Sequence, residues 1–383
     1  MSTIQDRLRS VRGETSQEQR EEALSSFHAP VRNTQQATGD TRRHTDADSI
    51  RREFGIPAWD RSKFAFDKVI PNYVERHWQP PTGESVGGTD FLATGKPGSG
   101  KSTLGCYFAT RDIEVNNSMH VWRGTSSRSE WLPLAPWVTL CLPKGADVSV
   151  RLESKLPSEP SVTLDVDDLD RIVREVVYYE DPVHLCHDIL ERGSIHVVYP
   201  DPTLRGCQAV YEESDEKQYD APSRGQLFHE EDPATHWWFG FILARVEHGP
   251  LDWTTITLDE IGDIVPQSVQ KDQFGSYQKA EMLKDSWVDA RKTGLTLNLY
   301  GHDEVDIWDG VRRKIRWRIQ MPGRANPTTA GNLVGFESVP MHTDQTSMMD
   351  VGQALMYTET NFEAFAWSDI PTPHSYKLKI TVN

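Results

Sequence analysis

The stretch that most constrains this chain is FLATGKPGSGKST at 91–103, which fits the pattern G-x-x-x-x-G-K-[ST] from Gly95 to Ser102. A short apolar run precedes the pattern, and STLGCYFATR at 102–111 has the composition of a helix. Successive backbone N–H groups of such a loop can point inward around a phosphate, and the positive end of the following helix adds to the attraction. The pattern therefore predicts a strand, a phosphate-binding loop and a helix, in that order.

The loop residues have separate predicted roles at a nucleotide phosphate site. Lys101 is expected to reach the β- and γ-phosphates, and the Ser102 hydroxyl is expected to join the shell of a Mg²⁺ ion. A glycine-rich turn without a ligand is the alternative, but the flanking strand and helix favour phosphate binding. The predicted nucleotide-binding residues are Gly95, Lys96, Pro97, Gly98, Ser99, Gly100, Lys101, Ser102 and Thr103.

A pair of adjacent acids follows a second apolar strand, in TTITLDEIGD at 254–263. Asp259 is predicted to hold the Mg²⁺ shell together with Ser102, and Glu260 is predicted to polarise the attacking water. An ordinary acidic turn at the end of a strand is the alternative. Because a separate catalytic carboxylate suits hydrolysis, the pair predicts an ATP hydrolase with ATP and Mg²⁺ as its cofactors. No N-K-x-D loop typical of switch GTPases is present.

The remaining chain alternates between predicted strands and predicted helices from residue 56 onward. Such alternation predicts an α/β fold with a RecA-like P-loop NTPase core, in which helices flank a mostly parallel central sheet. Residues 1–55 are polar and predict a disordered arm with one transient helix near 15–27. The ATPase domain is expected to span 56–383, with an acidic insertion around 144–235 and a helix over 168–179.

The amino-acid composition indicates the cellular compartment and the kinds of binding partner. The chain has 57 acidic and 41 basic residues, a formal net charge of -16, which argues against non-specific nucleic-acid binding by the whole surface but not against a local basic channel. The four cysteines form no C-x-x-C pair, which favours a reducing compartment. No apolar stretch approaches the length of a membrane span. These features predict a cytoplasmic protein, in the host cytoplasm if it is viral, with association to a membrane or a virion left open.

Two later stretches carry a resemblance to a known family. The first is WVDARKTGLTLNLYGHDEVDIWDGVRRKIRWRIQMPG at 287–323, and the second is MMDVGQALMYTETNFEAFAW at 348–367. The first stretch resembles the FtsK/HerA superfamily of DNA-pumping ATPases, in which a basic, glycine-containing turn leads into a strand that ends in a polar sensor. The second resembles the strand pair near the C-terminus of these proteins. The resemblance covers roughly 91–110 and 250–370 and is strongest toward compact ATPases of archaeal viruses and plasmids.

The resemblance implies further site residues and a ring. His302 stands where the superfamily usually has a glutamine that senses the γ-phosphate, which is a departure from the pattern. Arg291 or Arg318 would act as an arginine finger across a subunit boundary, and the alternative for either is a salt bridge. The implied assembly is a homo-oligomer, a hexamer, with double-stranded DNA as its partner. The implied function is translocation or packaging of nucleic acid.

Other readings remain beside this one. Along RRKIRWRIQM, Lys314, Arg316 and Arg318 would share one face of a strand and line a pore, pair with a neighbouring subunit, or simply meet solvent. One alternative function is a P-loop ATPase that drives particle assembly, extrusion or secretion without gripping DNA. Another is a structural oligomer that nucleotide only locks.

Overall fold

The computed structural model describes residues 16–32, 40–76, 90–156, 161–214, 226–229, 233–290, 292–328, 332–335, 345–372 and 374–383. The helices are α2 (Gln17–Ser25), α3 (Asp40–Phe54), α4 (Ile70–Val74), α5 (Lys101–Val115), α6 (Pro182–His184), α7 (Cys207–Glu212), α8 (Pro233–Glu247), α9 (Ile261–Ile264), α10 (Ser276–Ala290) and α11 (Asp309–Arg312). The strands are β1 (Asp90–Thr94), β2 (Met119–Arg123), β3 (Val138–Pro143), β4 (Val148–Ser154), β5 (Val162–Leu164), β6 (Glu175–Tyr179), β7 (Ile195–Val198), β8 (Thr254–Leu258), β9 (Leu295–Gly301), β10 (Trp317–Gln320), β11 (Gln353–Tyr357), β12 (Phe362–Ala366) and β13 (Tyr376–Val382).

A 10-stranded sheet in the order β12-β11-β10-β1-β9-β8-β2-β7-β3-β6 runs through the molecule. Its pairs are parallel from β10 to β6, and β11 and β12 add antiparallel at one end. The central strands are fully buried on both faces, because they are short apolar runs covered by helices on each side. The predicted α/β fold with a mostly parallel central sheet is confirmed.

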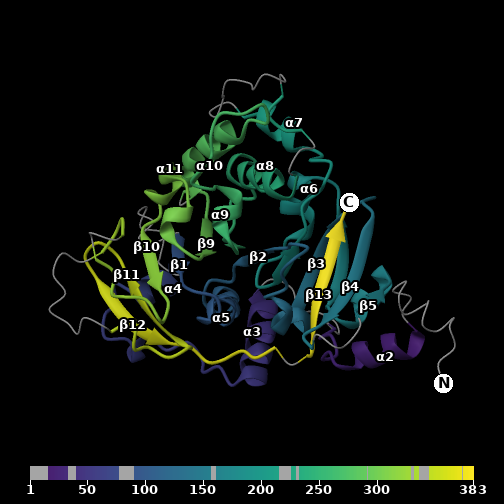
Figure 1. The fold of residues 1–383 in the computed structure, drawn as a ribbon, viewed down its shortest axis with the longest axis horizontal. Coiled ribbons are helices and arrows are strands. Elements are labelled where there is room, and N and C mark those ends of the chain that lie inside the picture. The colour runs from purple at the N-terminus through teal and green to yellow at the C-terminus, as the bar shows by residue number, and fades with distance from the viewer. Residues whose placement is uncertain are drawn as a thin grey trace.

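Helices cover both faces of this sheet (Figure 1). On one face lie α8, α9 and α10, and on the other lie α3 and α5. Neighbouring residues of β1 separate accordingly: Phe91 and Ala93 pack with the α5 side, whereas Leu92 packs with the α8 side. The two hydrophobic cores therefore meet only through the sheet, and α5 is fixed directly behind the strand that precedes it.

The segment predicted as an insertion contributes to the main sheet instead. Strands β6 and β7 are its members, and only β4 and β5 leave it, to form a small antiparallel sheet in the order β13-β4-β5. The predicted helix over 168–179 is wrong: a short 3-10 turn at Val166–Arg171 leads into β6. The run EVVYY at the end of this stretch is β-branched and aromatic, which favours a strand over a helix.

The N-terminal region differs from the predicted disordered arm wherever the structure describes it. Ser16 caps α2 through a capping box, and α3 brings Ala47 and Ile50 into the main core. Asp46 of α3 forms a buried ion pair with Arg174 at 2.7 Å. A few apolar residues and one buried ion pair thus anchor a segment whose average composition is polar. No helix in the described ranges has both the length and the apolar character needed to cross a membrane.

Candidate nucleotide-binding and hydrolysis site

The glycine-rich loop connects β1 to α5, as the sequence predicts. Gly100 ends the loop with a φ of 93°, a left-handed conformation that favours glycine, and any side chain there would press on Val351 and Trp367. A Cβ on Gly95 would lie 2.5 Å from Met321 Cβ, so only glycine fits beneath the loop. The backbone of the loop is therefore shaped by glycine at both ends.

Two polar side chains of the loop lack a strong partner of the kind that a phosphate provides. Lys101 Nζ donates to the carbonyl oxygens of Gly95 at 2.6 Å and Lys96 at 3.3 Å, and burial lowers its pKa. Ser99 Oγ is buried and has no hydrogen-bond partner among the residues that the structure describes. A buried donor without a partner is costly. A glycine cradle, an orphaned hydroxyl and a lysine together fit the phosphates of a nucleotide.

The strand order brings the ends of three strands together around this loop. Strand β9 lies between β1 and β8, so the residues that follow β9 stand between the loop and the acid pair. Ligands of open parallel sheets bind at the carboxyl ends of the strands, and these residues all lie there. The fold is that of a P-loop NTPase. The predicted RecA-like core is confirmed by this order and by the position of the loop.

The acid pair lies directly after β8. Glu260 has a φ of 51°, a left-handed conformation that is rare for a residue with a side chain and that recurs at functional sites. The Asp259 and Glu260 side chains are 15% and 11% exposed. Burial raises the pKa of Asp259, and the nearby Arg128, Arg123 and Lys101 only partly oppose this rise.

His302 and Arg128 both contact the Glu260 carboxylate. His302 Nε2 lies 3.1 Å from Glu260 Oε1, and its Nδ1 lies 3.5 Å from the Gly95 carbonyl oxygen. Arg128 Nη1 lies 2.8 Å from the same Oε1 and 3.4 Å from Asp259 Oδ2. Glu260 is thus connected to the loop through His302 and to a cation from the segment after β2.

The structure buries Arg318, one of the two arginines proposed as fingers, away from this centre. Arg318 is 1% exposed and donates from Nε and Nη2 to Glu304 Oε1, at 2.9 and 2.7 Å. It forms an internal ion pair, so the expectation of a basic strand face with Arg318 in it is wrong, although Lys314 and Arg316 are exposed. Arg318 cannot reach another subunit from this position. Arg291 lies outside the described residues.

Several residues at this site carry no recognisable sequence signal. Arg123 Nη1 donates to the Asp259 carbonyl oxygen at 2.8 Å, and Arg128 approaches the acid pair from a loop far away in sequence. Trp367 Nε1 donates to Thr103 Oγ1 at 3.1 Å. Isolated arginines and a tryptophan in loops follow no spacing rule, so only the folded arrangement identifies them.

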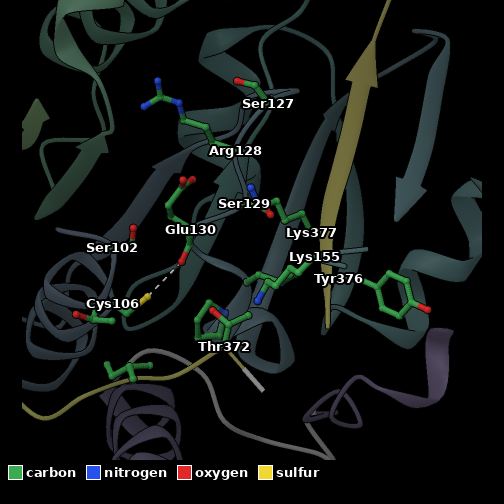
Figure 2. A pocket seen from close by; sticks show the side chains of 14 residues that line it. Ser102, Cys106, Ser127, Arg128, Ser129, Glu130, Lys155, Thr372, Tyr376 and Lys377 are labelled. Carbon is green, nitrogen blue, oxygen red and sulfur yellow. Dashed lines mark hydrogen bonds between the residues drawn. The ribbon is translucent and has the colours of Figure 1, made fainter. Parts of the chain in front are cut away.

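A cavity of about 160 Å³ lies beside Ser102, under the loop after β2 (Figure 2). Ser102 and Cys106 of α5 line one wall, and Lys155, directly after β4, and Lys377 of β13 line the opposite wall. Glu130 lies between these walls, and burial together with the charge of Asp259 raises its pKa to about 7. The cavity thus connects the start of α5 to the small sheet.

A magnesium ion fits the oxygen atoms at this edge of the sheet. Ser102 is exposed at the start of α5, and Asp259 lies close enough to Lys101 to influence its pKa. Mg²⁺ is typically bound by one or two protein oxygens together with substrate phosphates and water, rather than by a cage of side chains. Accordingly, the described residues contain no cluster of three or more His, Cys, Asp or Glu side chains arranged for a metal ion.

No family model and no curated protein matches this chain. Among solved structures it is similar to the genome packaging NTPase B204 from Sulfolobus turreted icosahedral virus 2 in complex with ATP-gammaS. The identity is 11%, the match covers 72% of this chain and 96% of that one, and the TM-score is 0.35. It is also similar to the pCW3 conjugation coupling protein TcpA, at 12% identity over 82% of this chain and 70% of that one, with a TM-score of 0.35.

A third likeness is to the type VII secretion ATPase EccC from Thermomonospora curvata, at 14% identity over 75% of this chain and 26% of that one, with a TM-score of 0.32.

Proposed function

We propose that this chain is a Mg²⁺-dependent ATP hydrolase that translocates or packages double-stranded DNA as an oligomeric ring. The observation that carries the hydrolase part is the position of His302, which contacts both the phosphate loop and Glu260. A nucleotide held at the loop would therefore present its terminal phosphate beside a buried carboxylate. Binding alone would not require that carboxylate.

The proposed chemistry divides between the loop and the acid pair. The loop amides and Lys101 hold the triphosphate and stabilise the charge that develops on its terminal phosphate. Ser102 and Asp259 would hold Mg²⁺, which would supply positive charge to the phosphate oxygens. Glu260 accepts a proton from a water molecule whose oxygen bonds to the γ-phosphorus. The bond from that phosphorus to the bridging oxygen breaks, and ADP and inorganic phosphate leave.

Arg128 and His302 act on Glu260 in this proposal. Both contact its Oε1 atom, so they fix the position of the carboxylate that accepts the proton. The His302 contact to the Gly95 carbonyl lets a change at the loop reach Glu260. His302 is therefore the proposed γ-phosphate sensor, in place of the glutamine usual in the superfamily.

The ring and the DNA partner are supported by the resemblance over 287–323 and 348–367. The second of these stretches folds into the antiparallel pair β11 and β12, as expected. Exposed Lys314 and Arg316 precede β10 and are candidates for contact with a phosphate backbone. Arg291 remains the candidate for a finger in trans. The net charge of -16 favours the second candidate, an ATPase that moves protein or particles without DNA.

ATP hydrolysis by the full-length chain, measured with and without double-stranded DNA, tests this proposal. We expect Mg²⁺-dependent hydrolysis that DNA stimulates, with a stimulation that weakens as salt rises, because phosphate contacts release counterions. Native mass measured on the same sample should give an oligomer. A protein that binds ATP without hydrolysing it would overturn the hydrolase. Hydrolysis that DNA leaves unchanged at every salt concentration would overturn the motor and favour the second candidate.

A further inference from the structure

A second cavity, of about 450 Å³, lies along α5 on the side toward β12. Its volume is in the range of small-molecule sites. We call it the aromatic pocket and define it by its ring-bearing walls and one acid: Trp59, Phe64, Tyr107, Phe365, Trp367 and Glu363. None of these residues has a role in the phosphate chemistry described above.

The aromatic pocket begins next to the phosphate loop. Trp367 belongs to its wall and also donates a hydrogen bond to Thr103, in the first turn of α5 directly after the loop. Tyr107 stands four residues after Thr103 on α5, a rise of about 6 Å along the helix. A ligand with its phosphates at the loop would therefore extend from Thr103 past Trp367 into the aromatic pocket.

Glu363 supplies an unused acceptor inside the aromatic pocket. The residue is 8% exposed, and its Oε2 atom has no hydrogen-bond partner in the described part of the chain. Its other oxygen, Oε1, accepts from the backbone N–H groups of Ala65 at 2.8 Å and Phe66 at 3.4 Å. A buried carboxylate oxygen without a donor is costly, so it is expected to meet one in a ligand.

The walls of the aromatic pocket are held in place before any ligand arrives. Trp59 donates from Nε1 to Glu75 Oε1 at 2.8 Å, and its backbone N–H donates to Glu114 Oε1 at 3.0 Å. Its ring stacks on Phe64 with centroids 5.1 Å apart. A preorganised aromatic wall lowers the entropic cost of binding a flat ring.

We infer that the aromatic pocket holds the adenine base of the nucleotide, with Glu363 Oε2 accepting a hydrogen bond from the exocyclic amine. This inference rests on the proposed function, because it extends the same nucleotide from its phosphates to its base. Guanine carries an oxygen where adenine carries that amine, and two acceptors repel each other. Guanine could instead offer adjacent N–H groups, but these need both carboxylate oxygens, and Oε1 is already occupied by Ala65 and Phe66.

Binding of ATP, GTP and inorganic tripolyphosphate to the full chain, measured by calorimetry with Mg²⁺, tests the inference. The wild type should bind ATP about tenfold more tightly than GTP, which is the size of one hydrogen bond to a charged group. Glu363→Gln turns the free acceptor into a donor and should abolish that preference. Glu359→Gln, on the exposed turn between β11 and β12, removes the same charge and should keep it.

Trp59→Ala provides a second test that does not depend on Glu363. Trp59 is only partly buried and its ring lines the aromatic pocket, so its loss should remove a stacking surface for the base without unfolding the protein. This variant should lose about tenfold or more in ATP affinity and keep its affinity for tripolyphosphate. Thermal unfolding by circular dichroism checks that each variant is folded.

The outcomes separate this inference from the proposed function. Equal binding of ATP and GTP by the wild type, or an unchanged preference in Glu363→Gln, would overturn the base assignment. Equally tight binding of tripolyphosphate and ATP would also overturn it, while the phosphate site would stand. Failure of all three ligands to bind would overturn the proposed function itself.

Discussion

Helix α5 and strand β9 each carry polar side chains in two places. The two places differ in how far the protein supplies hydrogen-bond partners for these side chains. Helix α5 begins with Lys101 and contains Asp112 near its other end. Strand β9 is followed by His302 at its carboxyl end and carries Asn298 within its buried length. We call the first group, with Asp259 and Glu260, the polar edge. We call the second the buried network; its members are Arg76, Asp112, His120, Asn298, Thr255 and Thr296.

The buried network is closed by its own hydrogen bonds. Arg76 Nη2 lies 2.5 Å from Asp112 Oδ1, and both side chains are 1% exposed. His120 Nδ1 and Asn298 Nδ2 lie 3.1 and 3.2 Å from Asp112 Oδ2. Although burial opposes ionisation, Arg76 and His120 outweigh it, and the pKa of Asp112 is lowered. The protein alone supplies the positive charge that this carboxylate needs.

The polar edge has fewer hydrogen-bond and charge partners among the described residues. The pKa of Asp259 is raised because burial outweighs its neighbouring cations, and Ser99 Oγ has no hydrogen-bond partner within the described ranges. Similar residue types therefore serve two purposes on the same elements. Where the chain completes the hydrogen bonds, the residues stabilise the fold, and where it does not, they are available to a ligand.

The largest expected effect is a loss of nucleotide affinity in the Lys101→Ala variant. Removing the ammonium takes away charge-assisted bonds to the phosphates, so ATP should bind at least about a hundredfold more weakly. The free energy of unfolding should change little, because the hydrogen bonds of Lys101 to described residues go to two loop carbonyls. Calorimetric titration with ATP measures the first and urea unfolding the second. Lys144→Ala, which removes a surface lysine paired with Glu180, is the matched control and should bind normally.

The second-largest expected effect is on the free energy of unfolding, and it concerns the buried network. Asp112→Asn keeps the shape but leaves Arg76 buried without its counter-charge, which should cost about 3–5 kcal/mol of unfolding free energy. Asp48→Asn, in a surface pair with Arg51, should cost under about 1 kcal/mol. The folded fraction of Asp112→Asn should bind ATP normally. If Asp112→Asn and Asp48→Asn lose the same free energy of unfolding in urea, the buried network does not stabilise the fold more than a surface ion pair does.

A smaller effect concerns a buried group that belongs to neither the polar edge nor the buried network. His374 stacks on Phe27 with centroids 4.5 Å apart, and burial, with the charges of Lys155 and His28, lowers its pKa to about 4. Because the unfolded chain takes up this proton near pH 6.5, its contribution should destabilise the fold as pH falls from 6.5 toward 4. The slope is about 1.4 kcal/mol per pH unit.

His374→Phe should remove that part of the pH dependence. Urea unfolding of both proteins at pH 7 and pH 5 measures it, and the variant should lose less stability than the wild type on acidification. An equal loss would mean that the burial of His374 does not contribute to acid sensitivity. Such a result would also weaken the rule that a polar group without partners, here the two ring nitrogens, is costly when buried.

The sequence predicts the parts of this molecule that local patterns encode. The phosphate loop, the strand before the acid pair and the helix over 276–290 are visible because glycine spacing and apolar periodicity are local. The position of β9 between β1 and β8 is a matter of topology, so the contact between His302 and Glu260 is not readable from the chain. The recruitment of Arg128 and the burial of Arg318 depend on folding for the same reason.

Average composition misled the prediction at the N-terminus. The segment is polar overall, yet Ala23, Leu24, Ala47 and Ile50 are buried in the main core. In the stretch over 168–179, the spacing of the apolar residues led to the wrong prediction of a helix. The apolar residues fit a helical period, but the β-branched residues among them favour a strand. In both places a few side chains decide the structure, and an average over the segment hides them.

The identity of the nucleotide bound to Glu260→Gln tests the central claim most directly. Glutamine keeps an oxygen for Arg128 and His302 but is a far weaker proton acceptor than the carboxylate, so hydrolysis should slow by about 10²–10⁴-fold. After incubation with ATP and Mg²⁺ and rapid desalting, the variant should retain intact ATP, whereas the wild type should retain ADP. A variant that turns over ATP at the wild-type rate and retains ADP would contradict the assignment of the polar edge as a hydrolysis site.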